Sequence, residues 1–255
     1  MTQKSFKQSK ILTGVGGAAI AYDCVNGNNP GVMFLGGFMS NMQGTKATAL
    51  EKICRTTGRA FVRFDYSGHG KSSGEFSKGT IGSWLSDALL VFDSCTDGPQ
   101  ILIGSSMGGW IMLLLALARP HKIKGLIGIA AAPDFTEDLL WKRFDSTTRA
   151  KIEKDGVYYE RNDYGNEPYV ITKELIEEGR NHLLLRQKIS INQPVRLLHG
   201  MQDDSVPWMT AYKLSEKISS EDVRIVLIKD GVHSLSREED LQCLQIMLQE
   251  LLDKD

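Results

Sequence analysis

Cysteine is scarce in this chain of 255 residues, and its four copies are widely scattered: Cys24, Cys54, Cys95 and Cys243. No two of them form a C-x-x-C pair, so the sequence disfavours a zinc site or a redox motif and favours a reduced compartment. Long apolar runs are also missing. The longest, residues 111–118, is too short to span a bilayer, and the polar stretch 1–10 lacks the apolar segment of a secretory signal. We therefore expect a cytoplasmic protein without a membrane span.

An excess of charge of either sign is absent as well. The 30 basic and 31 acidic side chains give a net charge of -1, which argues against a nucleic-acid groove or a polybasic membrane patch. The glycine-rich segment 65–72 reads D-x-x-G-x-G-x-S and has neither the spacing of a dinucleotide-binding loop nor a Walker lysine. We interpret it as a structural turn, and we expect no cofactor and no metal ion.

Short apolar segments alternate with helical patterns along most of the chain. This alternation favours one α/β domain with a mostly parallel eight-stranded sheet and helices on both faces. The predicted strands cover residues 10–13, 18–23, 31–35, 60–64, 100–103, 123–130, 195–198 and 223–228. The predicted helices cover residues 45–57, 81–94, 107–118, 208–218 and 238–252.

The alternation breaks once, between residues 132 and 193, where the sequence is rich in charged residues and tyrosine. A structureless loop of about sixty residues is uncommon in a compact domain, so this segment is predicted to fold. We predict a short helical cap insertion at 132–194, with helices at 137–144, 146–154 and 172–184, between the core segments 1–131 and 195–255. A lid is the interpretation that best explains its apolar side chains.

Ser106 is the strongest candidate for chemistry. It is the centre of Gly104-Ser105-Ser106-Met107-Gly108, a G-x-S-x-G pattern between a predicted buried strand and a predicted buried helix. This context is typical of a nucleophile elbow, in which a sharp turn presents the serine oxygen at the end of a sheet. The flanking glycines relieve the collisions that such a turn would cause.

A serine hydroxyl needs a base to take its proton and an acid to orient that base. Asp203 follows the strand 195–198 in a segment that matches H-G-x-x-D-x-x-V-P, with Asp204 as its rival, and His233 follows the strand 223–228. Loops at the carboxyl ends of parallel strands meet at one edge of a sheet, where α/β proteins place their sites. We therefore predict a catalytic triad of Ser106, Asp203 and His233.

The negative charge that develops on an attacked carbonyl oxygen requires fixed hydrogen-bond donors. The backbone N–H of Met107 at a helix N-terminus is one candidate, and that of Phe38, in the glycine-rich loop after strand 31–35, is the other. Beside this oxyanion hole, four further residues are candidates for the substrate pocket: Met39, Trp110, Leu139 and Trp208.

With these motifs the chain resembles the α/β-hydrolase superfamily, and within it the abhydrolase-domain-containing protein 10 group. The segments that carry the resemblance are 36–47, 64–68, 97–110 and 197–208. Members of that group are palmitoyl-protein thioesterases and acyl-glucuronide esterases, mitochondrial in animals. The resemblance implies Ser106 as nucleophile, Asp203 as acid and His233 as base. Because the chain lacks a mitochondrial-type leader, we expect a bacterial cytoplasmic relative, or a mitochondrial matrix protein if the chain is a trimmed mature form.

We therefore predict a serine hydrolase that cleaves carboxylic esters or acyl thioesters through an acyl-enzyme. Its substrates would be small molecules, with acylated proteins as a further class, and the sequence does not set an oligomeric state. A carbon–carbon hydrolase or a perhydrolase uses the same triad and stays an alternative. The alternative of another class is a non-catalytic binding protein on the same fold.

Overall fold

An eight-stranded sheet is the centre of the molecule. The computed structural model describes residues 9–161 and 168–254, so the prediction for stretch 1–10 falls almost entirely outside the described residues. The strands lie in the order β1-β2-β4-β3-β5-β6-β9-β10; β1 and β2 run antiparallel to their neighbours and the others are parallel. Their bounds are β1 Lys10–Thr13, β2 Ala19–Val25, β3 Asn28–Leu35, β4 Arg59–Phe64, β5 Gln100–Ser105, β6 Ile123–Ile129, β9 Val195–Gly200 and β10 Val223–Ile228.

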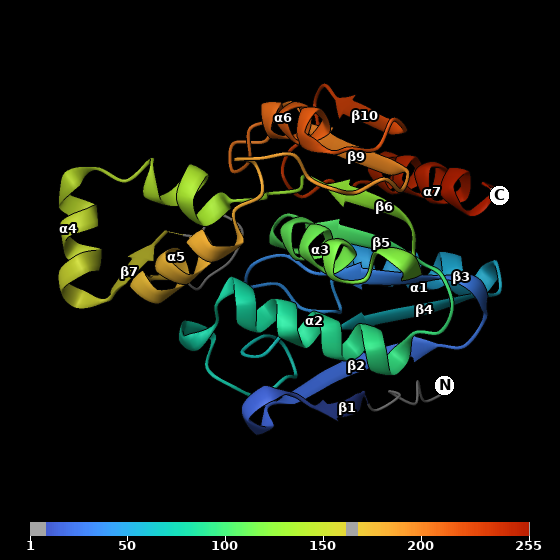
Figure 1. Cartoon of the computed structure of the whole chain (residues 1–255), viewed down its shortest axis with the longest axis horizontal. Helices are drawn as coiled ribbons and strands as arrows, with labels where there is room; N and C mark the ends of the chain where they lie inside the picture. Colours follow the sequence, from blue (N-terminus) through green and yellow to red (C-terminus); the bar gives the residue numbers. More distant parts are fainter. Residues whose placement is uncertain (1–8, 162–167, 255) are drawn as a thin grey trace, which may run out of the picture.

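Helices cover both faces of this sheet (Figure 1). Helices α1 (Thr45–Thr56) and α7 (Glu238–Leu252) pack on one face, and α2 (Ile81–Cys95), α3 (Met107–Ala118) and α6 (Met209–Lys217) pack on the other. Because both faces are buried, the central strands are apolar throughout rather than alternating. The predicted fold is confirmed. Three short 3-10 turns join these elements: Val15–Gly17, Phe76–Lys78 and Pro120–Lys122.

The insertion, which we define as residues 132–194, lies beyond the carboxyl ends of the strands, at the left of Figure 1. Its elements are the π-helix η4 (Thr136–Trp141), α4 (Ser146–Asp155), β7 (Val157–Glu160), β8 (Tyr169–Thr172), α5 (Lys173–Gly179) and η5 (Arg180–His182). They enclose a small apolar cluster of their own, formed by Phe144, Ile152, Ile171 and Ile176.

The prediction that the insertion is purely helical was wrong in one respect. Strands β7 and β8 form an antiparallel pair, with Tyr158 opposite Ile171. β-Branched and aromatic residues favour strands, and both segments carry them, but four residues are too few for their periodicity to be distinctive. The predicted helix at 172–184 is shorter than expected, because Thr172 caps α5 through Leu175 N–H and the chain leaves the helical conformation after His182.

Polar contacts fasten the insertion to the core. The fully buried carboxylate of Asp134, just after β6, accepts hydrogen bonds from the N–H groups of Leu184 (2.7 Å) and Leu185 (2.9 Å). The indole of Trp110 on α3 donates to the carbonyl of His182 (3.0 Å). The two ends of the insertion are therefore joined to each other and to the helix that follows the serine turn.

Candidate active site

Ser106 lies in the sharp turn between β5 and α3, with φ 54° and ψ -121°. A left-handed φ at a non-glycine residue costs roughly 1–3 kcal/mol and persists only where surrounding contacts hold it. Here the Ser106 N–H donates to the carbonyl of Ile129 (2.9 Å), and the Ser106 carbonyl accepts from Ala132 (3.1 Å). A Cβ on Gly104 would lie 2.4 Å from the carbonyl oxygen of Gly108, so the turn requires glycine at that position.

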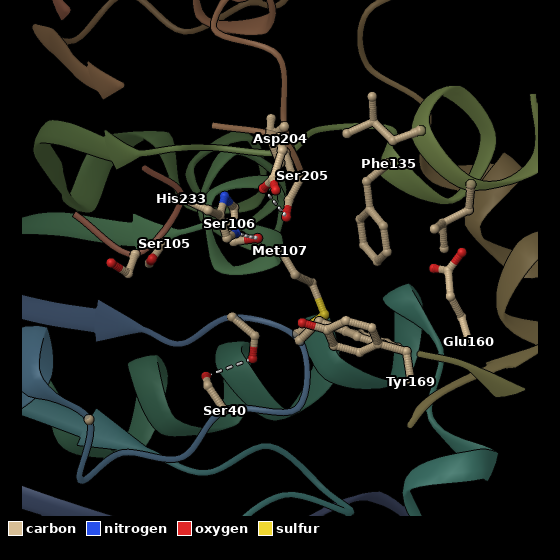
Figure 2. Close-up of a pocket in the computed structure, with 18 of the residues that line it drawn as sticks. Ser40, Ser105, Ser106, Met107, Phe135, Glu160, Tyr169, Asp204, Ser205 and His233 are labelled. Carbon is tan, nitrogen blue, oxygen red and sulfur yellow. Dashed lines mark hydrogen bonds between the residues drawn. The ribbon is translucent and has the colours of Figure 1, made fainter. Parts of the chain in front are cut away.

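Three side chains form a continuous line of hydrogen bonds at the carboxyl ends of β5, β9 and β10. The hydroxyl of Ser106 donates to Nε2 of His233 at 3.1 Å, and Nδ1 of His233 donates to Oδ2 of Asp203 at 2.7 Å. In this tautomer Nε2 carries the lone pair that accepts the serine proton. Figure 2 shows His233 beside Ser106 in the pocket. The structure thus brings together the three side chains selected from the sequence.

Asp203 is surrounded by donors. Its Oδ1 accepts the N–H groups of Ser205 (3.0 Å) and Val206 (2.8 Å), and its Oδ2 lies 3.3 Å from Nε2 of His199 in addition to the contact with His233. Burial raises the pKa of this carboxyl, but the hydrogen bonds from His199 and His233 outweigh burial and bring the pKa well below its usual range. Asp203 is therefore a carboxylate at neutral pH.

Asp204, the alternative candidate for the acid of the triad, has a different environment. It is exposed, it lines the pocket, and its Oδ1 lies 3.4 Å from the hydroxyl of Ser205 (Figure 2). The buried carboxylate of Asp203 makes the 2.7 Å contact with the imidazole of His233. The geometry therefore favours Asp203 as the acid.

The loop after β3 lies directly against the serine turn, because a Cβ on Gly37 would be 3.4 Å from that of Ser106. Within residues 9–161 and 168–254, the N–H of Phe38 donates to no other backbone group. The N–H of Met107 is the first of α3 and, as at any helix N-terminus, has no partner within the helix. Two N–H groups beside the serine thus have the capacity to bind an anionic oxygen, and the helix dipole adds to the attraction.

Asp65 fixes this loop, a role that the pattern of the structural turn 65–72 does not predict. Its Oδ1 accepts the N–H of Met42 (2.6 Å), and its Oδ2 accepts the N–H of Lys71 (2.8 Å). Burial raises the pKa of this carboxyl, and the two backbone hydrogen bonds oppose that rise. A Cβ on Gly70 would lie 2.2 Å from Oδ2, so the second glycine of the motif makes room for the carboxylate. The turn therefore links β4 to the loop after β3.

A pocket of about 770 Å³ extends from Ser106 to the insertion. Figure 2 shows Phe135 and Tyr169 reaching into it from the side opposite the serine. The Phe38 and Phe135 rings meet edge to face, with their centroids 5.7 Å apart. The apolar lining consists of Phe34, Phe38, Ala47, Met107, Ala132, Phe135, Leu139, Leu140, Ile171, Val206 and Pro207. Charged side chains in the lining, besides Asp204, are Lys46, Asp138, Arg143, Glu160 and Arg161.

The predicted pocket residues divide between the lining and other positions. Leu139 lies in the lining, whereas Met39, Trp110 and Trp208 do not. Trp110 is fully buried and packs edge to face on Phe135, with ring centroids 5.8 Å apart, so it supports the wall from behind. Met39 and Trp208 are half-buried beside the site. The sequence prediction for these three residues therefore requires correction.

Neither 9–161 nor 168–254 contains a group of three or more His, Cys, Asp or Glu side chains that could hold a metal ion. The same part of the chain has no helix long and apolar enough to cross a membrane.

The mostly parallel sheet, the strained serine turn and the Ser106–His233–Asp203 line together define an α/β hydrolase. A family model described as serine aminopeptidase, S33, matches residues 31–156. Human mitochondrial palmitoyl-protein thioesterase ABHD10 is 41% identical over 236 residues, which are 92% of this chain and 77% of that protein.

Two solved structures have nearly the same extent as this chain. Alpha/beta hydrolase domain-containing protein 10 from mouse superposes with a TM-score of 0.90 at 39% identity, covering 97% of this chain and 99% of that one. A protein from Agrobacterium vitis S4 described as a hydrolase gives a TM-score of 0.93 at 36% identity, covering 96% and 99%. The chain belongs to the α/β-hydrolase family that includes ABHD10, and it is an enzyme of the esterase and thioesterase class, as predicted.

Proposed function

We propose that the chain hydrolyses acyl esters and thioesters through a covalent acyl-enzyme on Ser106. The observation that carries this proposal is the unbroken line from the Asp203 carboxylate through the His233 imidazole to the Ser106 hydroxyl. A serine in such a line loses its proton to the imidazole as it attacks, while the carboxylate stabilises the imidazolium that forms. Each of the three groups thus has a role that its geometry suits.

The reaction has two halves. In the first, Oγ of Ser106 forms a bond to the carbonyl carbon, and Nε2 of His233 takes the serine proton and delivers it to the leaving alcohol or thiol as the bond to that group breaks. In the second, His233 takes a proton from water, and the resulting hydroxide displaces the acyl group from Ser106. Ser106 regains its proton, and the acid is released.

The N–H groups of Phe38 and Met107 are proposed to hold the oxyanion of both tetrahedral intermediates. Loss of a single donor of this kind typically slows turnover by about 10²–10³-fold. Asp65 contributes indirectly, since its bond to Met42 N–H fixes the loop that carries Phe38. This arrangement supports carbonyl chemistry and requires no cofactor.

The insertion is proposed to act as a lid that shapes the acyl-binding space. Its apolar lining residues Phe135, Leu139 and Leu140 face the same pocket as Ser106 and Met107 of the core. Apolar walls of this kind gain roughly 0.8 kcal/mol for every CH₂ group that they bury, so an acyl chain of several carbons suits the pocket better than acetate.

Relatives named palmitoyl-protein thioesterase motivate acyl thioesters, including acylated proteins, as the substrate class to test beside simple esters. The test is the rate of hydrolysis of p-nitrophenyl esters and matched acyl thioesters of increasing chain length, by wild type and by Ser106→Ala. We expect kcat/KM to rise with chain length for wild type and hydrolysis of every substrate to be abolished by Ser106→Ala.

Two results of this panel would refute the proposal. Undiminished hydrolysis by Ser106→Ala would remove the acyl-enzyme, and inactivity of the folded wild type toward all members would favour a binding protein. Cleavage of a carbon–carbon bond in a β-diketone, with no ester or thioester turnover, would instead select the carbon–carbon hydrolase alternative.

A further inference from the structure

A second histidine contacts the same carboxylate oxygen of Asp203, Oδ2, as His233 does. His199 is the fifth residue of β9 and is 1% exposed. Its Nε2 lies 3.3 Å from Oδ2 of Asp203 and 2.9 Å from the carbonyl oxygen of Val206. Both neighbours of Nε2 are acceptors, so Nε2 carries a proton that it donates to them.

The other ring nitrogen of His199 identifies its charge state. Nδ1 is buried and has no hydrogen-bond partner within the described residues. A second N–H on this atom would be a buried donor without an acceptor, and it would belong to a cation, which burial disfavours further. The neutral tautomer with its proton on Nε2 leaves only a lone pair unsatisfied. His199 is therefore a donor that carries no charge.

We propose that His199 is a positioning residue for Asp203: an uncharged second donor that orients the carboxylate toward His233 without competing for its charge. The same N–H of His199 also donates to the carbonyl oxygen of Val206. The N–H of Val206 in turn donates to Oδ1, the other carboxylate oxygen of Asp203 (2.8 Å). The loop that carries the acid is thus fixed to the strand from which it leaves.

The absence of charge matters for the reaction proposed above, on which this inference rests. In the transition state His233 becomes a cation that the carboxylate of Asp203 stabilises. A cationic neighbour at position 199 would neutralise the same carboxylate and weaken that stabilisation. A neutral N–H fixes the carboxylate at a much smaller electrostatic cost to the base.

The test compares two amide variants. His199→Gln places an N–H close to the position of the imidazole Nε2, whereas the side chain of His199→Asn is too short to reach Asp203. We expect kcat of the Asn variant to fall about 10- to 100-fold, the ratio that corresponds to loss of a hydrogen bond to a charged group, and the Gln variant to recover most of it. Leu197→Ala is the matched control, since Leu197 is buried on the same strand two residues earlier and is not in the triad.

The pH profile separates positioning from simple packing. With its second donor removed, the Asp203 carboxylate interacts more strongly with protonated His233, so the acid limb of kcat/KM should move to higher pH in the Asn variant and return in the Gln variant. Asp204 and Lys46, whose ammonium donates to Ser234 O, line the same pocket as His233, as do the charged residues of the insertion, and all of them are common to the variants. Leu197→Ala should lower the melting temperature and leave the limb unmoved.

Equal kcat and equal acid limbs in wild type and both amide variants would overturn the inference, as would a Gln variant no better than Asn. Should the Asn variant not fold, the tautomer in wild type decides: nitrogen NMR at pH 7.5 is expected to show the His199 proton on Nε2 alone, and a proton on Nδ1 would contradict the proposal. The activity of Ser106→Ala is measured in parallel. If it keeps full activity, the proposed function fails; if it is inactive while the His199 variants match wild type, only this inference fails.

Discussion

The core and the insertion are built differently, and in the proposed function the difference separates chemistry from substrate selection. The core encloses its strands between two large apolar layers, and each side chain of the proposed triad lies in the turn or loop that follows one of those strands. Among its described residues, the insertion has an apolar cluster of four buried side chains, and it is fastened to the core by Asp134 and Trp110. A large buried layer therefore holds the proposed catalytic side chains, while a smaller apolar unit supplies part of the pocket wall.

The largest expected effect concerns the core chemistry. Asp203→Asn preserves the shape of the acid but favours the wrong tautomer of His233, so kcat should fall about 10⁴-fold on short and long substrates alike. Asp204→Asn is the matched control and should stay within about threefold of wild type, as substitutions away from buried networks usually do. Steady-state kinetics on both variants checks this, and the reverse ranking would transfer the acid role to Asp204.

The second prediction compares stability in the two regions. Leu102→Ala removes a fully buried side chain between the sheet and α3 and should lower the free energy of unfolding by about 2–5 kcal/mol. Ile152→Ala removes an equally buried side chain from the insertion and should loosen that unit with a smaller change in global stability. Denaturant unfolding with hydrogen exchange measures both. Equal losses would show that insertion and core unfold as one unit.

The third prediction concerns the loss of folding stability in acid that the buried imidazole of His69 causes. Burial lowers the pKa of His69 from 6.5 to about 4, against the opposing hydrogen bond to Ser67 O. The unfolded chain binds a proton at this site below pH 6.5 and the folded chain does not, so stability is complete above pH 6.5 and falls as pH drops toward 4. The loss attributable to His69 approaches about 3 kcal/mol at 1.36 kcal/mol per pKa unit.

His69→Phe keeps an aromatic ring between Phe76 and Trp84 and removes the titration. Its stability should therefore decline less steeply between pH 6.5 and 4 than that of wild type, whatever its stability at pH 7. Parallel slopes in urea unfolding across this range would assign the acid sensitivity to other groups.

The smallest expected effect is on the pocket wall. Leu139→Ala should reduce kcat/KM for long acyl chains by roughly 5- to 30-fold, the equivalent of about 1–2 kcal/mol of lost apolar contact, and leave acetate esters unchanged. Trp208→Ala is a useful comparison, because Trp208 does not line the pocket and should show no dependence on chain length. A uniform loss on all substrates after Leu139→Ala would mean that the insertion also affects the chemical step.

The sequence predicts the core well because each of its signals is local. Ser106, Asp203 and His233 each follow an apolar strand, and parallel strands bring their carboxyl ends together whatever lies between them in the chain. Their positions are those expected, while their catalytic roles stay predictions.

The features that sequence reasoning missed depend on tertiary packing. Helix α3 is apolar on all sides, so nothing in its pattern says that Trp110 points toward the insertion rather than into the pocket. Strands β7 and β8 have four residues each, too few for periodicity to separate them from helix. The hydrogen bond from Met42 N–H to the carboxylate of Asp65 joins two loops that no local motif connects.

Fluorophosphonate labelling with peptide mapping tests most directly whether the three core loops activate one serine. We expect a single adduct on Ser106 in the wild type, no adduct in Ser106→Ala, and labelling of His233→Ala slowed by several orders of magnitude because the base is gone. An adduct on any other residue, or unchanged labelling of His233→Ala, would contradict the relay from Asp203 through His233 to Ser106.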